Sequence, residues 1–555
     1  MAGPPNPATL ERPWIAAYPP GVPASYRVPS VALPRLLDDA ARDFPDQPAL
    51  VAGGVTLDHT ELARRVDDVA RVLVELGVRP QARVVVALRN EPALPVVLLA
   101  VWRVAAVAVP VAPDASSERQ VATVADARAD AVVGHADVLH TLADADALPD
   151  VAVLVTGAEW PSGRGPRWLR RPRRPRPRAV RQGTSALADL LTDLGDAPLP
   201  APPAPSDPAV LAYRRGGTEA LAAVLSHANL VANAFQARLW VPDVQAGRER
   251  FLVVDPCHDV VPLTLGVLAA LLSAGCVVLA HDPSPAALAR LVEREQPTLT
   301  ATTPERLEGV LGDADAARRD LSSLRVCLVS GGPLDPALAA TVEQRTDGAR
   351  VRAAYGVAEA GALTHAQPVY GRVVPDTVGL PVTGTVAVVV DPDDAGRVLG
   401  PGEVGRLLVH GPQVAVGYWE RDGVPGARLP GGWIDTGDLA ASDEDGVFRI
   451  IGRDDEVVRR DGALVSPRWI ATVLERHPAV RDAGVVASAA EVLAAAVLRR
   501  RAHATPEELL AHCRAHLEPG TAPDRVTIVD ALPEPGADPS VWHRLRERLR
   551  REDPT

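Results

Sequence analysis

Lysine is absent from this sequence, and all 58 of its basic residues are arginine. Methionine occurs once, and phenylalanine and asparagine occur four times each. Residues with A/T-rich codons are therefore scarce as a group, which indicates a GC-rich coding sequence. Selection against lysine itself, to avoid lysine modification or self-acylation, is the alternative explanation. Codon drift of this kind turns lysine into arginine but leaves glycine, proline and threonine unchanged.

Cysteines are also few, and long hydrophobic runs are missing. The four cysteines lie far apart and form no metal-ligand pair, which favours a reducing cytoplasm. The N-terminus is proline-rich and polar, so no secretory signal is expected. The most apolar segment, Val260 to Ala280, contains Pro262 and Ser273 and predicts a buried helix followed by a strand, not a membrane span. A formal net charge of -12 argues against nucleic acid as a partner.

The periodicity of the sequence indicates a multidomain α/β protein. Its 555 residues exceed what one hydrophobic core organises, so two or more domains are expected. Helical spacing of apolar residues occurs at Leu36 to Asp43 and Thr60 to Leu76. Strands that alternate with such helices indicate largely parallel sheets, and strands crowd together after Val386 in a small β-rich subdomain. The expected strands are Arg83 to Leu88, Ala131 to Val133, Val151 to Val155, Val210 to Tyr213, Arg325 to Val329, Val386 to Val390 and Arg406 to His410.

A basic insertion interrupts this pattern between Trp160 and Gly183. It places nine arginines among prolines, which exclude helix and strand, so an exposed extended segment is expected. Three interpretations remain open: a solvated loop, contact with an anionic membrane surface, and contact with nucleic acid. A second proline-rich stretch, Ala197 to Pro208, is typical of a linker that leads into a buried strand.

Four short motifs follow one another in the second half of the chain: SGGPL, YGVAE, WIDTGDLAASDEDG and GRDDEVVRRDG. Each alone is typical of an ordinary loop. Their order and spacing resemble the adenylate-forming superfamily, which includes acyl- and aryl-CoA ligases, luciferases and peptide-synthetase adenylation domains. The resemblance runs from about Arg12 to Arg550. The run ERPWIAAYPPGVPASY and the basic insertion are most similar to bacterial long-chain fatty-acyl-CoA ligases.

The resemblance implies a fold, ligands and a reaction. The expected fold class is α/β, with a large N-terminal AMP-binding domain over 1–452 and a small, mobile α+β C-terminal domain over 453–555. The large domain would contain two α/β subdomains and a small β-rich subdomain. The implied cofactors are ATP or AMP, Mg²⁺ and CoA, and the implied substrate is a fatty or other carboxylic acid. The family joins acid and CoA through an acyl-adenylate with release of pyrophosphate and AMP. The expected location is the cytoplasm, either free or peripheral to the inner face of the membrane.

The resemblance also assigns roles near the adenine. Gly331 and Gly332 belong to a turn that lies against adenine, and Tyr355, followed by Gly356, stacks on it. Glu359 helps to hold Mg²⁺ and is one of two expected catalytic residues.

The ribose and acyl contacts are implied by the other motifs. Asp438 accepts hydrogen bonds from the ribose hydroxyls, a task that suits a carboxylate with its several lone pairs. Arg453 is the second ribose contact, and Asp455 is the expected hinge. His258, in DPCHD, matches a family histidine near the acyl pocket and is the other expected catalytic residue.

The phosphate-binding loop departs from the family pattern. The family has a Ser/Thr/Gly-rich loop with Pro-Lys-Gly, whose small residues and lysine surround the phosphates. Here the stretch is YRRGGTEALAAVLSHANL. Arg214 and Arg215 replace Thr and Ser, Glu219 replaces Gly, and residues 221–223 (Leu-Ala-Ala) replace Pro-Lys-Gly. Thr218 keeps one hydroxyl for nucleotide binding. Codon drift does not explain these changes.

The C-terminal tail departs in the same way. Asp538 and Pro539 stand where the family has Gly and its catalytic Lys, and a proline donates no hydrogen bond. Arg459 replaces a further Lys, which drift explains, and Trp469 replaces an acidic residue. Three hypotheses follow: a catalytically impaired homologue that binds nucleotide, acyl group or partner; a working ligase with rearranged phosphate contacts; and altered acyl-transfer chemistry.

Overall fold

The structure is a computed structural model, and its helices and strands fall into two compact units. The larger unit lies within Glu11–Val386 and Val409–Ile434, and the smaller within Met1–Leu10, Ala387–Leu408 and Asp435–Thr555. The structure describes residues 3–155, 184–192, 194–213, 221–419, 430–460, 463–488, 490–517 and 520–532.

A nine-stranded sheet in the larger unit has the order β16-β15-β14-β13-β12-β10-β11-β1-β2. The six strands from β14 to β1 are parallel to their neighbours, so their carboxyl ends meet at one edge of the sheet. In open parallel sheets this edge is where ligands bind. The strands are β1 (Pro48–Ala52), β2 (Val55–Asp58), β10 (Arg250–Val253), β11 (Cys276–Leu279), β12 (Leu299–Thr302), β13 (Val326–Val329), β14 (Arg350–Tyr355), β15 (His365–Ala366) and β16 (Leu380–Pro381).

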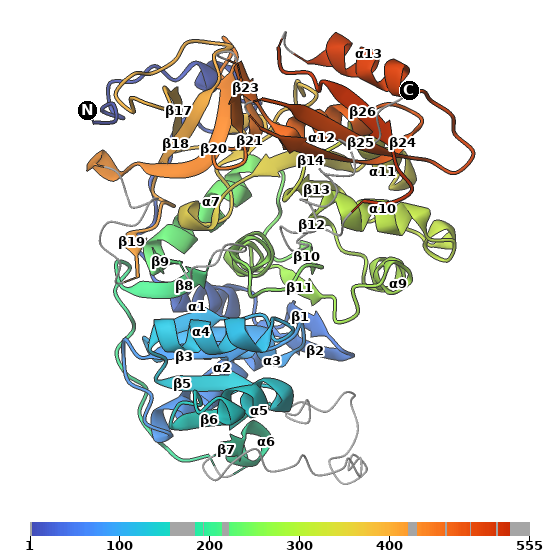
Figure 1. Ribbon diagram of the computed structural model, residues 1–555. Coiled ribbons are helices and arrows are strands. Elements are labelled where there is room, and N and C mark those ends of the chain that lie inside the picture. The colour runs from blue at the N-terminus through green and yellow to red at the C-terminus, as the bar shows by residue number, and fades with distance from the viewer. Residues whose placement is uncertain are drawn as a thin grey trace. The chain divides into compact units, whose positions relative to one another are not determined.

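An eight-stranded sheet in the same unit has the order β19-β9-β8-β4-β3-β5-β6-β7. Strands β3 to β6 pair in parallel, and α4 and α5 lie beside them (Figure 1). The strands expected from the sequence in this region are confirmed to within one or two residues. The strands are β3 (Arg83–Ala87), β4 (Val107–Pro110), β5 (Ala131–Gly134), β6 (Val151–Leu154), β7 (Thr184–Ala186), β8 (Pro208–Tyr213), β9 (Ala222–Ser226) and β19 (Gly417–Tyr418).

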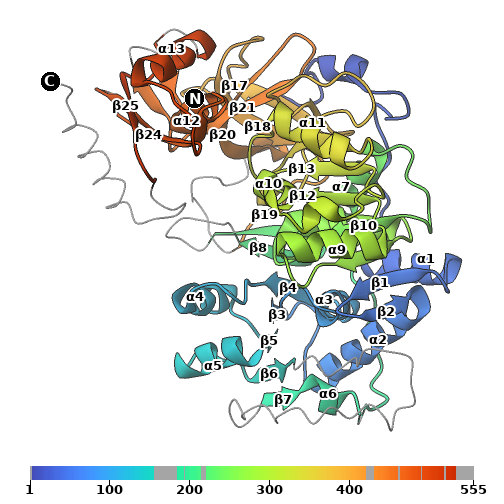
Figure 2. The same ribbon diagram turned by 90° about the vertical axis from the view of Figure 1, so that its right-hand side faces the viewer.

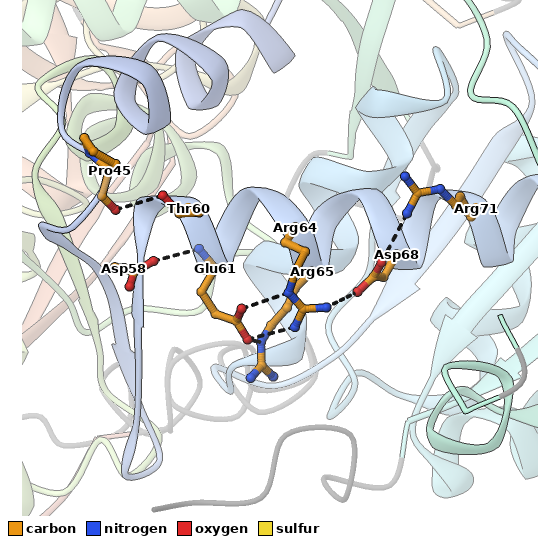
Figure 3. Close-up of polar contacts among 8 residues, drawn as sticks. All are labelled: Pro45, Asp58, Thr60, Glu61, Arg64, Arg65, Asp68 and Arg71. Carbon is orange, nitrogen blue, oxygen red and sulfur yellow. Dashed lines mark hydrogen bonds and ion pairs between the residues drawn. The ribbon is translucent and has the colours of Figure 1, made fainter. Parts of the chain in front are cut away.

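Helices of the larger unit cover both sheets. The long helix α2 begins where the Asp58 carboxylate accepts from the backbone N–H of Glu61, and charged side chains form ion pairs along its exposed face (Figure 3). The helices are α1 (Pro34–Asp43), α2 (His59–Glu75), α3 (Ala93–Arg103), α4 (Ser117–Ala127), α5 (Ala136–Asp144), α6 (Leu187–Leu190), α7 (His227–Trp240), α8 (Ala269–Leu272), α9 (Pro285–Glu295), α10 (Pro304–Gly312) and α11 (Pro336–Arg345).

The apolar segment singled out in the sequence forms a buried helix and strand, as predicted. Its helix starts as a π-helix, η3 (Pro262–Leu268), continues as α8 and is followed by β11. A side chain on Gly266 would meet Val253 at 2.5 Å, so this glycine lets the helix lie close against β10. Among the described residues, no helix has the length and hydropathy needed to cross a membrane.

Helices α9, α10 and α11 lie along one side of β10, β12 and β13 (Figure 2). A small cavity lies between these helices and the nine-stranded sheet. Its volume is about 60 Å³, and its lining is mostly aliphatic. Thr300 and Thr302 of β12 both line it. The Thr300 hydroxyl donates to the carbonyl of Leu252 at 3.0 Å, whereas the Thr302 hydroxyl is buried with no partner in the described part of the chain.

Replacing Thr302 by valine should stabilise the larger unit by about 1 kcal/mol, because a buried hydroxyl without a partner is lost and the β-branched shape is kept. Urea unfolding followed by tryptophan fluorescence measures the change. Thr300→Val is the matched control on the same strand, and it should destabilise because the buried hydrogen bond to the carbonyl of Leu252 is lost. Equal effects of the two substitutions on the free energy of unfolding would contradict the difference in hydrogen bonding between the Thr300 and Thr302 hydroxyls.

The smaller unit contains a four-stranded sheet, a hairpin and a three-stranded sheet. The four-stranded sheet, order β17-β18-β20-β21, is the β-rich subdomain expected after Val386. The three-stranded sheet, order β24-β25-β26, packs with α12 and α13 around an aliphatic core, which gives the expected α+β character. The elements are β17 (Val386–Val390), β18 (Gly405–His410), β20 (Ile434–Ser442), β21 (Phe448–Arg453), β22 (Val458–Arg460), β23 (Ala463–Val465), α12 (Pro467–Glu475), β24 (Val480–Ala487), β25 (Val492–Leu498), α13 (Pro506–His516) and β26 (Arg525–Ile528).

Candidate nucleotide- and acid-binding site

The predicted adenine-side residues of the larger unit follow directly from adjacent parallel strands. Gly331 and Gly332 come just after β13, and Tyr355 is the last residue of β14. Gly331 has a φ of +87°, a conformation that favours glycine. A side chain on Gly332 would lie 3.3 Å from Cγ of Pro304, so this turn lies against the start of α10. The two motifs therefore sit at the carboxyl edge of the nine-stranded sheet, where the topology places ligands.

Gly356 and Glu359 belong to a tight turn after β14. A Cβ atom on Gly356 would lie 2.0 Å from the carbonyl oxygen of Ala362, so only glycine fits where the chain folds back. Glu359 lies in the short helix η5 (Ala358–Ala360) and is 3% exposed. One of its carboxylate oxygens, Oε1, accepts a hydrogen bond from the hydroxyl of Tyr418 at 3.2 Å.

His258 lies in the loop that follows β10, at the same edge of the sheet. The amide side chain of Asn90 fixes this loop, because it accepts from the backbone N–H of Cys257 at 3.2 Å and donates to the carbonyl of Asp255 at 3.1 Å. Nε2 of His258 lies 3.9 Å from a carboxylate oxygen of Asp259. Burial raises the pKa of the Cys257 thiol, which favours its protonated form.

The strands on either side of the phosphate loop are described, but the loop is not. Residues Arg214 to Ala220, with Thr218 and Glu219, lie outside the described residues, as do the basic insertion and the tail with Pro539. Strands β8 and β9 are antiparallel, and Tyr213 pairs with Ala222. Ala222, which the sequence resemblance aligns with the family lysine, is 2% exposed within β9. Ser226 and Asn229 form a capping box that starts α7 directly after β9.

In the smaller unit, the two predicted ribose contacts lie opposite each other on paired strands. Asp438 of β20 pairs in register with Arg453 of β21, and the guanidinium lies 3.5 Å from the carboxylate. Arg453 also donates to the backbone carbonyl of Thr436 at 3.2 Å. Its Nε lies 3.3 Å from the carboxylate of Asp455, whose side chain is 73% exposed, as suits a residue expected at a hinge. The Asp438 carboxylate and the Arg453 guanidinium are therefore already close together.

A buried amide network behind the Glu359 turn was missed by the motif analysis. Asn233 of α7 donates to the carbonyl of Leu363 at 2.7 Å and accepts from its backbone N–H at 3.0 Å. It also donates to Gln236 at 2.9 Å, and Gln236 in turn donates to Gln413 at 3.1 Å. The signal in the sequence was the presence of Asn and Gln in an otherwise apolar helix. Tyr418, the donor to Glu359, was missed as well.

Comparison with known proteins agrees with this geometry. The family model for the AMP-binding enzyme matches residues 37–419, and that for the AMP-binding enzyme C-terminal domain matches residues 470–537. A long-chain-fatty-acid–CoA ligase of Bacillus subtilis is 28% identical, over 98% of each chain. A feruloyl-CoA synthase of an Amycolatopsis species is 30% identical, over 92% of this chain and 97% of its own. The crystal structure of an anthranilate CoA ligase in complex with anthranoyl-AMP has a TM-score of 0.78 at 20% identity, over 95% of this chain and 98% of its own.

These findings confirm the predicted resemblance and the predicted α/β fold class. In the larger unit the family motifs follow β13 and β14, and in the smaller unit they lie on the paired strands β20 and β21. The matched regions cover most of the sequence. The chain is acyl-CoA synthetase-like and belongs to the AMP-binding enzyme family.

Proposed function

We propose that this chain binds AMP and a carboxylic acid on the family scaffold, while its ability to form an acyl-adenylate from ATP is strongly reduced. The observation that carries the proposal is the contrast between two sets of positions. Tyr355, Glu359, Asp438 and Arg453 keep the family residue types, whereas the lysine position holds Ala222, buried within β9. An alanine there supplies no charge to a triphosphate.

The residues present fit the nucleoside monophosphate. In the larger unit, Tyr355 would supply an aromatic face for adenine. In the smaller unit, the Asp438 carboxylate, 3.5 Å from the Arg453 guanidinium, would accept hydrogen bonds from ribose hydroxyls. Glu359 would hold Mg²⁺, since carboxylate oxygen is a ligand that this cation prefers, and the bound cation would neutralise phosphate charge. CoA is proposed as the acyl acceptor, because relatives are named as CoA ligases. Rotation about Asp455 would permit the second half-reaction, in which the acyl group passes to CoA.

The residues at the phosphates do not fit ATP well. Glu219 places a carboxylate in the loop where the triphosphate approaches, and at about 4 Å two like charges repel by roughly 1 kcal/mol in water and several near a protein surface. Arg214 and Arg215 of the same sequence stretch carry the opposite charge. Pro539 donates nothing where the family lysine stabilises the transferring group.

The acid is proposed as a fatty or other carboxylic acid, because the relatives are named for fatty and aromatic acids. Association with an anionic membrane surface stays a prediction that rests on the nine arginines of residues 160–183. The domain boundary near 452 and the hinge at Asp455 are likewise proposals carried over from the sequence.

Calorimetry is expected to show that AMP binds at least as tightly as ATP, because the added phosphates meet Glu219 and no lysine. Both nucleotides are titrated into the full chain with MgCl₂ in excess. Glu219→Gly should tighten ATP binding several-fold and leave AMP binding unchanged. Glu403→Gly, which removes a carboxylate from a surface turn of the smaller unit, is the control and should change neither. Markedly tighter binding of ATP than of AMP to the unaltered chain would refute the proposal.

Pyrophosphate exchange with ATP reports adenylation directly, and it is measured across a panel of fatty and aromatic acids. Exchange near background with every acid is expected, because losing several transition-state contacts together lowers a rate by orders of magnitude. Exchange well above background with any acid would identify a working ligase, the second candidate function, with rearranged phosphate contacts.

A further inference from the structure

The segment from Pro412 to Trp419, called the 412–419 strap, binds several parts of the candidate site within the larger unit. At its start, the carbonyl of Pro412 accepts from the side-chain amide of Asn229, which belongs to the cap of α7. At its end, Nε1 of Trp419 donates to the carbonyl of Asp126 at 2.9 Å. Both ends of the strap are therefore fixed.

The middle of the strap adds an edge strand to the phosphate-loop hairpin. Tyr418 pairs with Ala223, and Gly417 pairs with Val224, in antiparallel register. The backbone N–H of Trp419 donates to the carbonyl of Ala222 at 2.9 Å. The strap thus lies beside β9, the strand that leads directly out of the phosphate loop.

The strap also holds Glu359 at two points. Its backbone N–H at Ala415 donates to the carbonyl of Glu359 at 2.8 Å, and the hydroxyl of Tyr418 donates to the Glu359 carboxylate at 3.2 Å. Glu359 is 3% exposed, and a rotation of its carboxylate would break this partly buried hydrogen bond. The backbone contact holds the main chain of Glu359, and the phenol contacts one oxygen of its carboxylate.

We propose that Tyr418 is a positioning residue that orients the Glu359 carboxylate for a divalent cation at the phosphates. This inference rests on the proposed function, since it assumes that a nucleotide binds beside Glu359. A phenol suits the task because it is neutral and donates one hydrogen bond, so the carboxylate keeps its negative charge for the cation. Since the same strap pairs with β9, the carboxylate and the strand leaving the phosphate loop share one rigid support.

The test compares ATP affinity in MgCl₂ and in EDTA by calorimetry, without any acid, for the full chain and its variants. The ratio of the two affinities is the magnesium-dependent gain. Tyr418→Phe should lower this gain about fivefold, which is the loss of one ordinary hydrogen bond, and leave the affinity in EDTA unchanged. Glu359→Gln should abolish the gain, and the double variant should equal Glu359→Gln. An unchanged gain in Tyr418→Phe would overturn the proposal.

Tyr370→Phe is the matched control, because the hydroxyl of Tyr370 also donates to a carboxylate, that of Asp243 at 2.7 Å, at an exposed place away from Glu359. It should leave the gain unaltered. If the unaltered chain shows no magnesium-dependent gain, the proposed binding of Mg²⁺ with the nucleotide is refuted. Amide hydrogen exchange then tests separately whether Tyr418 positions Glu359. Faster exchange of residues 358–363 in Tyr418→Phe than in Tyr370→Phe supports positioning, and equal exchange overturns it.

Discussion

Replacement of Asn233 by leucine is expected to lower the free energy of unfolding of the larger unit by about 3 kcal/mol or more. Asn233 is fully buried, and its side chain satisfies both backbone groups of Leu363 as well as the carbonyl of the Gln236 side chain. Leucine has a similar size but can make none of these bonds. Three buried polar groups then lose their partner, and each such loss costs about 1–3 kcal/mol.

The same substitution should loosen the turn that carries Glu359. Gly361 packs against Asn233, since a side chain on that glycine would lie 3.2 Å from the amide carbon. Without the amide, the backbone from Gly361 to Leu363 has no donor or acceptor in α7 to hold it. Nucleotide binding measured below the unfolding transition should therefore weaken as well, even though Asn233 is no part of the predicted site.

Urea unfolding followed by tryptophan fluorescence measures the effect, because Trp102 and Trp240 are fully buried reporters in this unit. Gln344→Leu on the exposed face of α11 is the matched control and should change stability by less than about 0.5 kcal/mol. A loss of less than 1 kcal/mol in Asn233→Leu would mean that the amide network contributes no net stability.

The sequence predicted regular elements well where periodicity was strong. Helix α2 begins one residue before the predicted Thr60, because its apolar side chains at helical spacing form one face that can be buried. Strand β17 has the predicted bounds, because it is a short continuous apolar run and is buried at every position. The π-helical start of η3 was not predicted. Apolar residues on all faces of that segment carry no period, so nothing in the pattern distinguishes a π-helix from an α-helix.

The candidate site was predicted in part, for a related reason. The motifs singled out Gly331, Tyr355 and Glu359. Only the motif with Gly331 was expected after a strand, the one found as β13, whereas β14, which ends at Tyr355, was not predicted. Tyr418 and Asn233 could not be assigned roles, because each acts through a contact across more than 50 residues of sequence, and such pairings depend on tertiary packing. Arg453 and Asp438 were predicted as separate ribose contacts, and the pairing of their strands adds that the two side chains meet.

Acidification is expected to destabilise the larger unit well above the pH at which carboxylates titrate. His227 and His365 are fully buried, and desolvation lowers the pKa of His227 to about 4 and that of His365 to about 3. Asp207 acts on His227 in the opposite direction but does not outweigh burial. In the unfolded chain both imidazoles have a pKa of about 6.5.

Stability is lost on acidification because both pKa values are lower in the folded protein than in the unfolded chain. Because the folded pKa values are depressed, the unfolded chain binds protons first, so this stability is complete above about pH 6.5 and is lost as the pH falls toward the folded values. A pH of 5 lies about 1.5 units below the unfolded pKa of each histidine. The free energy of unfolding therefore falls by about 2 kcal/mol for each histidine and by about 4 kcal/mol for the two together. His59 shifts in the same direction through burial and adds to the loss.

Unfolding in urea at pH 8 and at pH 5 tests this expectation. His365→Gln should be less stable than the unaltered chain at pH 8, because the Thr364 hydroxyl loses its contact with the ring at 2.9 Å. That deficit should shrink by about 2 kcal/mol at pH 5, since glutamine takes up no proton in either state. The exposed His503→Gln should follow the unaltered chain at both pH values. High salt should change little, because burial and not surface charge sets the shift. A deficit for His365→Gln that stays constant from pH 8 to pH 5 would show that His365 is already protonated in the folded protein.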